Sequence, residues 1–247
     1  LPPQTTVPLI NFGGATCGGD LGTILARSCN TSFAQMAVED IGPDRMIQGA
    51  ESWGFNDAPP LDLPAVADSA FPSDFTDNLP ALAQAAIGQN DVAATPLQMA
   101  LVAAGVANDG VIMAPYVVEE VRDSEGDVLD TYDPEVWRQA VDGPTARTMR
   151  EAMIGVVERP DGTAGSLAIP GFEVGGKTGT AQLGTDPPRS HAWIVGFAGP
   201  PGGPAQVAVA VIVEGEEGAS EQTGGQVAGP IARTMMEATL QIQAAGG

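Results

Sequence analysis

The only lysine of the chain lies in a run of small and hydroxyl-bearing residues, Lys177-Thr178-Gly179-Thr180. An ammonium group beside threonine hydroxyls combines a positive charge with directional donors, and this combination suits a carboxylate ligand. Two more glycines precede the lysine. Glycine inside a strand often marks close approach by a ligand or another backbone. We therefore favour a binding role for Lys177 over the alternative of a solvated lysine at a strand end.

A second polar pair, Ser28 and Asn30, is predicted to lie in a tight connection between two helices. A serine hydroxyl can pass a proton, and an asparagine amide can bind a substrate carbonyl. The alternative is ordinary capping and turn chemistry. The first helix is expected over Leu21–Ala26, and the second from Thr31, its N-cap, to about Ile41. Their inward faces are expected to carry Leu21, Ile24 and Leu25, then Phe33, Met36 and Ala37.

The nucleophile that usually accompanies these groups is a Ser-x-x-Lys motif, and no serine in the chain is followed by a lysine three residues later. A Ser-His-Asp triad is not indicated either, because no Gly-x-Ser-x-Gly turn is present. We interpret His191, the single histidine, as a structural residue on the strand beside Lys177. Trp193 and Phe197 are interpreted as core residues. The sequence thus predicts most of an active site without its nucleophile.

The composition of the chain excludes several classes of function. The chain has 247 residues, an ordinary apolar content and a formal net charge of -21. Without a basic run it is not expected to bind nucleic acid or an anionic membrane surface. Cys17 and Cys29 form either a disulfide, which would suit an extracytoplasmic compartment, or two buried thiols. One histidine and two cysteines do not make a metal site, and no cofactor is expected.

The pattern of apolar residues predicts helices first and a sheet afterwards, which is an α+β layout. Thr95 is the expected N-cap of a helix reaching about Asn108, with Pro96 in its first turn and Gln98 completing a capping box. A loop over Glu51–Asn78 could form a lid or rim. A hairpin is expected over 116–122 and 128–132, and a helix from Pro144. Strands are expected over 172–182, 191–198 and 206–214, followed by a solvated acidic loop over 214–221. A final helix over 226–244 is expected to cover the sheet with Ile231, Met235 and Leu240.

Taken together, the short motifs make the chain resemble the C-terminal part of the transpeptidase domain of a class B (monofunctional) penicillin-binding protein of the actinobacterial type. The resemblance covers nearly the whole chain and keeps the order of the motifs. The matching stretches are Asn11-Phe12-Gly13-Gly14, Cys17-Gly18-Gly19, Ser28-Cys29-Asn30-Thr31-Ser32-Phe33-Ala34, Thr95-Pro96-Leu97-Gln98-Met99-Ala100, Gly162-Thr163-Ala164, Gly176-Lys177-Thr178-Gly179-Thr180-Ala181-Gln182 and His191-Ala192-Trp193.

The resemblance implies a penicillin-binding protein/serine β-lactamase-like fold and a peptidoglycan D,D-transpeptidase that works through a serine acyl-enzyme. It implies that Ser28 shuttles a proton, Asn30 holds a substrate amide and Lys177 supplies positive potential. Thr178 and Thr180 would bind the substrate carboxylate. The implied partners are peptidoglycan stem peptides, β-lactams and proteins of the division or elongation machinery.

In such a protein the N–H of Thr180 would be one of two oxyanion donors, and Gly179 would leave room for the substrate. Asn90 stands where the family usually has glycine. The nucleophile helix, two strands of the sheet and a membrane anchor would lie before Leu1, so we expect a truncated or processed start and an extracytoplasmic location.

We therefore expect residues 1–247 to be a partial transpeptidase domain, with a mainly helical part over 1–110 and the sheet with its closing helix over 171–247. On its own such a chain would be poorly stable and would not be acylated by penicillin. The alternatives are a β-lactamase or D,D-carboxypeptidase of the same superfamily, and a non-catalytic module that binds D-Ala peptides or β-lactams. A purely structural acidic domain would make the motif matches accidental.

Overall fold

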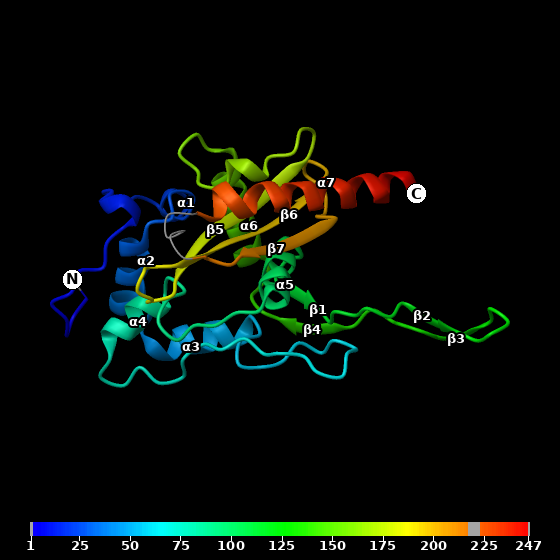
Figure 1. The fold of residues 1–247 in the computed structure, drawn as a ribbon, viewed down its shortest axis with the longest axis horizontal. Helices are drawn as coiled ribbons and strands as arrows, with labels where there is room; N and C mark the ends of the chain where they lie inside the picture. Colours follow the sequence, from blue (N-terminus) through cyan, green and yellow to red (C-terminus); the bar gives the residue numbers. More distant parts are fainter. Residues whose placement is uncertain (1, 217–222, 247) are drawn as a thin grey trace.

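The computed structural model describes residues 2–216 and 223–246. Within them, helices precede an antiparallel sheet and a long helix closes the chain (Figure 1). Residues 217–221 of the predicted acidic loop lie outside the described residues. No described helix is both long and apolar enough to span a membrane. The principal elements are α1 (Leu21–Ala26), α2 (Asn30–Met36), α3 (Pro43–Ser52), α4 (Leu79–Ala85), α5 (Pro96–Ala107), β1 (Val111–Met113), β2 (Glu120–Arg122), β3 (Val128–Thr131), β4 (Val136–Gln139), α6 (Gly143–Glu158), β5 (Glu173–Gln182), β6 (Ser190–Gly199), β7 (Val207–Val213) and α7 (Gly229–Gly246).

The central sheet consists of β5, β6 and β7 in that order, with both pairs antiparallel. These are the three strands that the sequence predicts. Their antiparallel pairing is also as expected, because short Pro- and Gly-rich connections favour antiparallel neighbours. Lys177 lies opposite Val195 and Gly179 opposite Trp193. Within the described residues β5 pairs only with β6 and β7 only with β6, so each leaves one edge open. The open edge of β5 carries the lysine motif.

The closing helix α7 crosses one face of the sheet (Figure 1) and follows a π-helical turn over Gly224–Ala228. Our prediction of its inward face was wrong in part. Leu240 is buried, but Ile231 and Met235 are 46% and 54% exposed. The buried face is the row of every fourth residue that includes Leu240, because side chains four apart lie above one another on a helix. That row is Ala228, Ala232, Met236 and Leu240.

The helical part has its own small core around Phe71 and Phe75, against which α3 and α4 pack. The sequence analysis did not predict α3 or α4. Most of the predicted 51–78 loop is irregular, but Phe71, Phe75 and Ser69 are buried, so this stretch contributes to a core and is not a free lid. Leu21 of α1 was expected to face inward and is instead exposed, because Ile24, Leu25 and Ala26 supply the buried face.

The start of α5 confirms Thr95 as the N-cap, whose side chain accepts from the N–H of Gln98 at 3.1 Å. The predicted capping box is incomplete. The Gln98 amide donates to the carbonyl of Trp53 at 2.7 Å instead of returning to Thr95, whose N–H donates to Ser69. Gln98 is fully buried, and a buried amide must find a partner, so a long-range partner replaces the local one.

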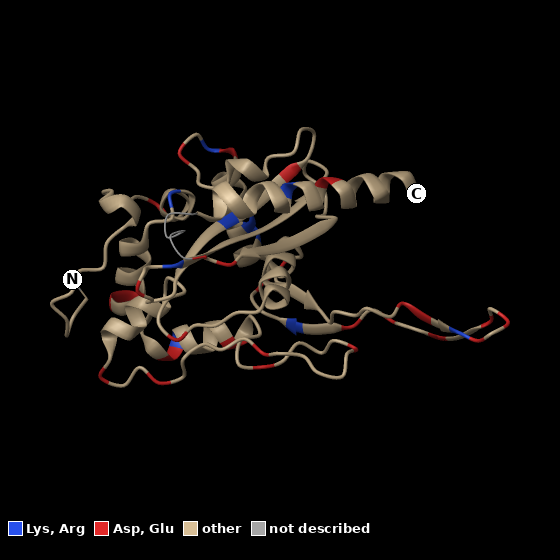
Figure 2. Ribbon diagram, in the orientation of Figure 1, with Lys and Arg blue, Asp and Glu red and all other residues tan. Residues whose placement is uncertain are grey.

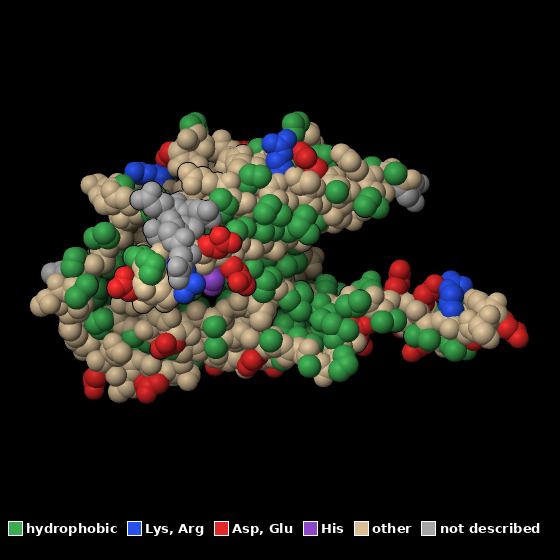
Figure 3. All heavy atoms as spheres, in the orientation of Figure 1, with side chains coloured by type: hydrophobic (Ala, Val, Ile, Leu, Met, Phe, Trp, Pro, Cys, Tyr) green, Lys and Arg blue, Asp and Glu red, His purple; other side chains and the backbone are tan. Residues whose placement is uncertain are grey.

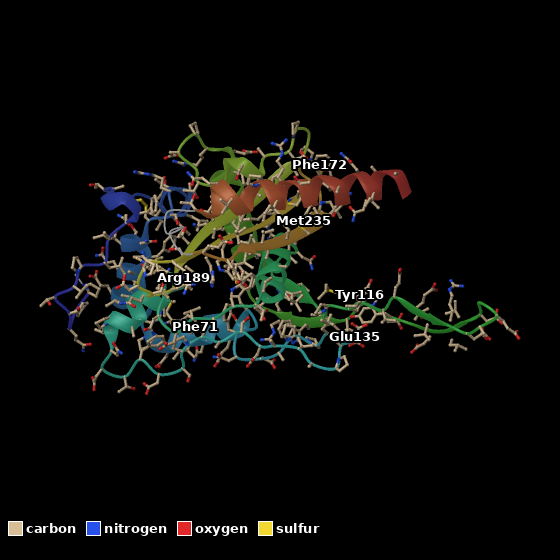
Figure 4. All side chains as sticks on the ribbon, in the orientation of Figure 1. Phe71, Tyr116, Glu135, Phe172, Arg189 and Met235 are labelled. Atoms are coloured by element: carbon tan, nitrogen blue, oxygen red, sulfur yellow. A yellow bond between two sulfur atoms is a disulfide. The ribbon has the colours of Figure 1, made fainter. Side chains whose placement is uncertain are left out.

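The predicted hairpin is confirmed as β2 and β3, which project from the body as an arm (Figure 1). Tyr116 and Tyr132 stack at its base with ring centroids 3.8 Å apart, and Figure 4 labels Tyr116 where the arm leaves the body. A second pair, β1 and β4, joins the arm to the body and was not predicted. Acidic residues lie along the arm and the surface loops (Figure 2), in keeping with the strongly negative net charge.

Candidate active site

The connection between α1 and α2 is tight. Ser28 has a φ of 55°, in the left-handed region, and Cys29 is the N-cap residue of α2. Asn30 is the first residue of α2, so it does not lie in the connection as expected. Thr31 is not the N-cap either. Its N–H and its hydroxyl both donate to the side-chain oxygen of Asn11, at 3.0 and 3.2 Å. A remote side chain thus satisfies a free N–H at the helix start.

The structure joins Cys17 to Cys29 in a disulfide, with the Cα atoms 5.5 Å apart. Cys29 is completely buried. The bond ties the glycine-rich segment before α1 to the start of α2. A second tie comes from Thr163, whose N–H donates to the carbonyl of Ala26 at 3.1 Å. The residues on both sides of Ser28 are therefore anchored, which fixes the position of the Ser28 backbone.

Lys177 on β5 reaches this connection. Its Nζ donates to Ser28 Oγ at 2.7 Å and to the carbonyl of Thr178 at 2.8 Å, although Ser28 and Lys177 are 149 residues apart in the sequence. The residue as a whole is half-buried, but burial of its ammonium lowers the pKa of Lys177 from 10.5 to about 8. Desolvation disfavours the charged form of a lysine. Lys177 can therefore change between its charged and neutral forms near pH 8, and its charged form can attract an anion.

Thr178 and Thr180 point to the face of β5 opposite Lys177, because side chains alternate along a strand. The Thr178 hydroxyl donates to the Thr163 hydroxyl at 2.8 Å. The open edge of β5 lies between the two faces. A ligand lying along that edge could therefore contact both the lysine and the threonines. The predicted carboxylate receptor requires this, because it combines the ammonium charge with the threonine hydroxyls.

The middle of the motif is tightly packed. A Cβ built on Gly179 would lie 3.1 Å from Cβ of Trp193 on β6. That separation is closer than ordinary contact between side chains. Packing against Trp193 therefore favours glycine here, in addition to the room for substrate that the resemblance implies. Trp193 is half-buried, whereas Phe197 is buried as expected. His191 is half-buried, and its Nδ1 accepts a hydrogen bond from the N–H of Gly215 at 3.1 Å, which is a structural contact.

Two residues at the site were not given a role by the sequence analysis. Thr163 contacts the Thr178 hydroxyl, and the amide of Gln89 bonds to the edge of β5 at Thr180 and Gln182. Thr163 lies in the matching stretch Gly162-Thr163-Ala164, which could have drawn attention to it, whereas no quoted stretch contains Gln89. Asn90, next to Gln89, has a φ of 62°. Left-handed backbone favours glycine and next asparagine, which accounts for asparagine at a position where the resemblance led us to expect glycine.

Comparison with known proteins places this geometry in a family. The model of the "Penicillin binding protein transpeptidase domain" matches residues 11–237. The chain is 39% identical over 245 residues to "Peptidoglycan D,D-transpeptidase PbpA" of Mycolicibacterium smegmatis, covering 97% of this chain and 48% of the relative. The protein of the same name from Mycobacterium tuberculosis is 38% identical with the same coverage. The chain thus spans about half the length of these curated relatives.

Solved structures agree. The ceftriaxone acyl-enzyme complex of penicillin-binding protein A from M. tuberculosis superposes with a TM-score of 0.85 at 37% identity, covering 98% of this chain and 54% of that chain. The D,D-transpeptidase domain of a peptidoglycan glycosyltransferase from Eggerthella lenta gives 0.81 at 35% identity, with 94% and 56% covered. The expected α+β transpeptidase fold is confirmed. The chain belongs to the penicillin-binding protein transpeptidase family.

Proposed function

We propose that this chain is the C-terminal part of a D,D-transpeptidase domain, and that the longer protein cross-links peptidoglycan stem peptides through a serine acyl-enzyme. The observation that carries the proposal is the 2.7 Å contact between Lys177 Nζ and Ser28 Oγ beside the open edge of β5. It joins a proton-carrying hydroxyl, a cation and a peptide-binding edge in one place. Family membership and the names of the relatives support the same reaction.

In this reaction a serine upstream of the present chain attacks the carbonyl of the penultimate D-Ala of a stem peptide. The amide bond to the terminal D-Ala breaks, and that D-Ala leaves with a proton on its amine. The attacking serine hydroxyl loses its proton, Ser28 would pass a proton on to the leaving amine, and Lys177 would supply positive potential beside it. An amine of a neighbouring stem peptide then attacks the ester, forms the new amide bond and releases the serine.

Substrate binding would use the edge of β5 and the start of α2. The hydroxyls of Thr178 and Thr180 would bind the terminal carboxylate, and the Asn30 amide would hold a substrate amide. The N–H of Thr180 would be one of two donors to the oxyanion, a contact worth roughly 3–4 kcal/mol of transition-state stabilisation. Gly179 leaves this part of the edge uncovered by a side chain.

The longer protein would act at the extracytoplasmic face of the cell membrane, where its peptidoglycan substrate lies. The Cys17–Cys29 disulfide is in keeping with an oxidising compartment. Its small-molecule ligands would include β-lactams, since structures of the M. tuberculosis relative are described as penicillin G and imipenem acyl-enzyme complexes. Partners in the division or elongation machinery are part of the proposal.

The test is intact-mass measurement after exposure to penicillin. The chain alone should gain no covalent adduct, because it contains no Ser-x-x-Lys. The same chain expressed with the codons that precede Leu1 should gain one stable adduct. Steady hydrolysis of penicillin would instead indicate a β-lactamase, and reversible binding without an adduct would indicate a non-catalytic module. An adduct on the chain alone would refute the assignment of the nucleophile to an upstream segment.

The role of Ser28 is tested in the longer protein by Ser28→Ala. Loss of a positioned proton carrier should slow acylation by about 100-fold or more. The matched control is Ser124→Ala, which removes an exposed hydroxyl at the tip of the hairpin arm and should leave the rate unchanged. Equal acylation rates for both variants would exclude Ser28 from proton transfer.

A further inference from the structure

The side-chain amide of Gln89 pairs with the open edge of β5 as a neighbouring strand would. Its Nε2 donates to the carbonyl of Thr180 at 3.0 Å, and its Oε1 accepts from the N–H of Gln182 at 3.2 Å. These two backbone groups flank Ala181. One residue of a parallel strand would bond to the same two groups. Gln89 therefore bonds to β5 as a single residue of an adjacent parallel strand would, and it closes the edge at that point.

The backbone around Gln89 holds its side chain in this position. The N–H of Gln89 donates to the carbonyl of Gln84 at 3.0 Å, and the N–H of Gly88 donates to Ala85 at 3.0 Å, so both are tied to the end of α4. Gly88 and Asn90 have φ values of 72° and 62°. The chain thus turns sharply on each side of Gln89, with residues that tolerate left-handed backbone.

These contacts constrain the backbone of Thr180. The N–H and C=O of one residue point to the same side of an extended strand, so the N–H of Thr180 faces the same open edge as its carbonyl. On one side of this N–H the Thr178 carbonyl is bound by Lys177, and on the other side the Thr180 carbonyl is bound by Gln89. The donor is held between two carbonyls whose oxygens are already engaged.

The same contacts also join the two parts of the site. Gln89 follows α4 in the helical part, while its partners belong to β5 of the sheet. Ser28 and Lys177 form a further hydrogen bond between these parts at the site. We propose that Gln89 is a positioning residue of the acyl-transfer reaction. It fixes the end of β5 against the helical part, so that the N–H of Thr180 is aimed at the oxyanion. This inference rests on the proposed transpeptidase function.

The experiment uses the longer protein, expressed with the codons that precede Leu1, and measures acylation by a fluorescent penicillin at a series of concentrations. In Gln89→Ala the limiting acylation rate constant should fall by about tenfold or more, because a small displacement of a stabilising donor is costly. The half-saturating concentration should change less. The matched control is Gln35→Ala, since the exposed Gln35 amide bonds, within residues 2–216 and 223–246, only to Glu39 on the same helical stretch.

A second variant, Gln89→Glu, separates positioning from loss of folding. The carboxylate can accept from the N–H of Gln182 but cannot donate to the carbonyl of Thr180. The rate relative to the unaltered protein should therefore be low at about pH 7 and should recover toward about pH 4.5, where a glutamic acid begins to carry a proton that it can donate. A merely structural defect would not recover on acidification.

The outcomes also separate this inference from the proposal beneath it. If the unaltered longer protein is not acylated, the transpeptidase proposal fails and this inference fails with it. If the unaltered protein is acylated and both Gln89 variants react at its rate, only the positioning role is overturned. A Gln89→Glu deficit that is the same at both pH values also overturns it.

Discussion

Lys177 has a pKa lowered to about 8 by burial, so the charge that the proposed reaction needs is present below that pH and is lost above it. In the longer protein, the rate of acylation by penicillin should fall as pH rises through about 8, because neutral lysine no longer attracts the penicillin carboxylate. Lys177→Arg should react at a lower rate but without this alkaline decline, since a guanidinium stays charged. Rates measured from about pH 6 to pH 10 test this. The prediction fails if the decline is unchanged in the arginine variant.

Some side-chain contacts of the site could be predicted from the sequence and others could not. The Lys177–Ser28 contact could be anticipated because the only lysine of an acidic chain stands in a strand motif, and the order of the motifs pointed to a serine partner. The contacts of Gln89 with β5 could not, because its partners lie 91 and 93 residues away. Asn11 likewise caps α2 from 20 residues away. A side chain that bonds to a remote backbone leaves no local pattern in the sequence.

Helices and strands with local signals were predicted well. The cap of α5, the apolar spacing of α1 and the Pro- and Gly-rich connections of β5, β6 and β7 are set by neighbouring residues, and these elements lie close to where they were expected. The helices α3 and α4 were missed because they are short and border the proline- and aspartate-rich stretch 51–78, so the sequence analysis assigned no helix to them. Their stability comes from packing around Phe71 and Phe75, which is a tertiary effect.

The orientation of α7 yields a matched pair of substitutions in adjacent methionines. Met236 is fully buried, whereas Met235 is 54% exposed. In the 247-residue chain, Met236→Ala should lower the free energy of unfolding by about 2–5 kcal/mol through loss of burial and formation of a cavity. Met235→Ala should change it by about 0.5 kcal/mol or less. Chemical denaturation of both variants measures the difference, and similar losses would mean that the helix is rotated from the orientation described.

The chain as a whole leaves apolar surface uncovered. Figure 3 shows hydrophobic side chains gathered where α7 and the base of the hairpin arm face each other across a recess. Ile231, Met235 and Ile242 of α7 are among the exposed large residues, as are Val117 and Val136 near the arm. The edge of β7 is also open within the described part of the chain. Exposed patches and unpaired edges of this kind mark surfaces that bind another segment or aggregate.

We expect strands preceding Leu1 in the longer protein to pair with β7 and to cover this side of α7. Thermal unfolding should therefore occur at a lower temperature in the 247-residue chain than in the longer protein. The methionine pair makes the comparison specific. Met235→Ala should be nearly neutral in the short chain but should cost more than about 1 kcal/mol in the longer one, because the side chain becomes buried only there. Met236→Ala should be costly in both. If Met235→Ala is equally neutral in the two proteins, the preceding segment packs elsewhere. If the short chain unfolds cooperatively and at a high temperature, its exposed apolar surface needs no covering segment.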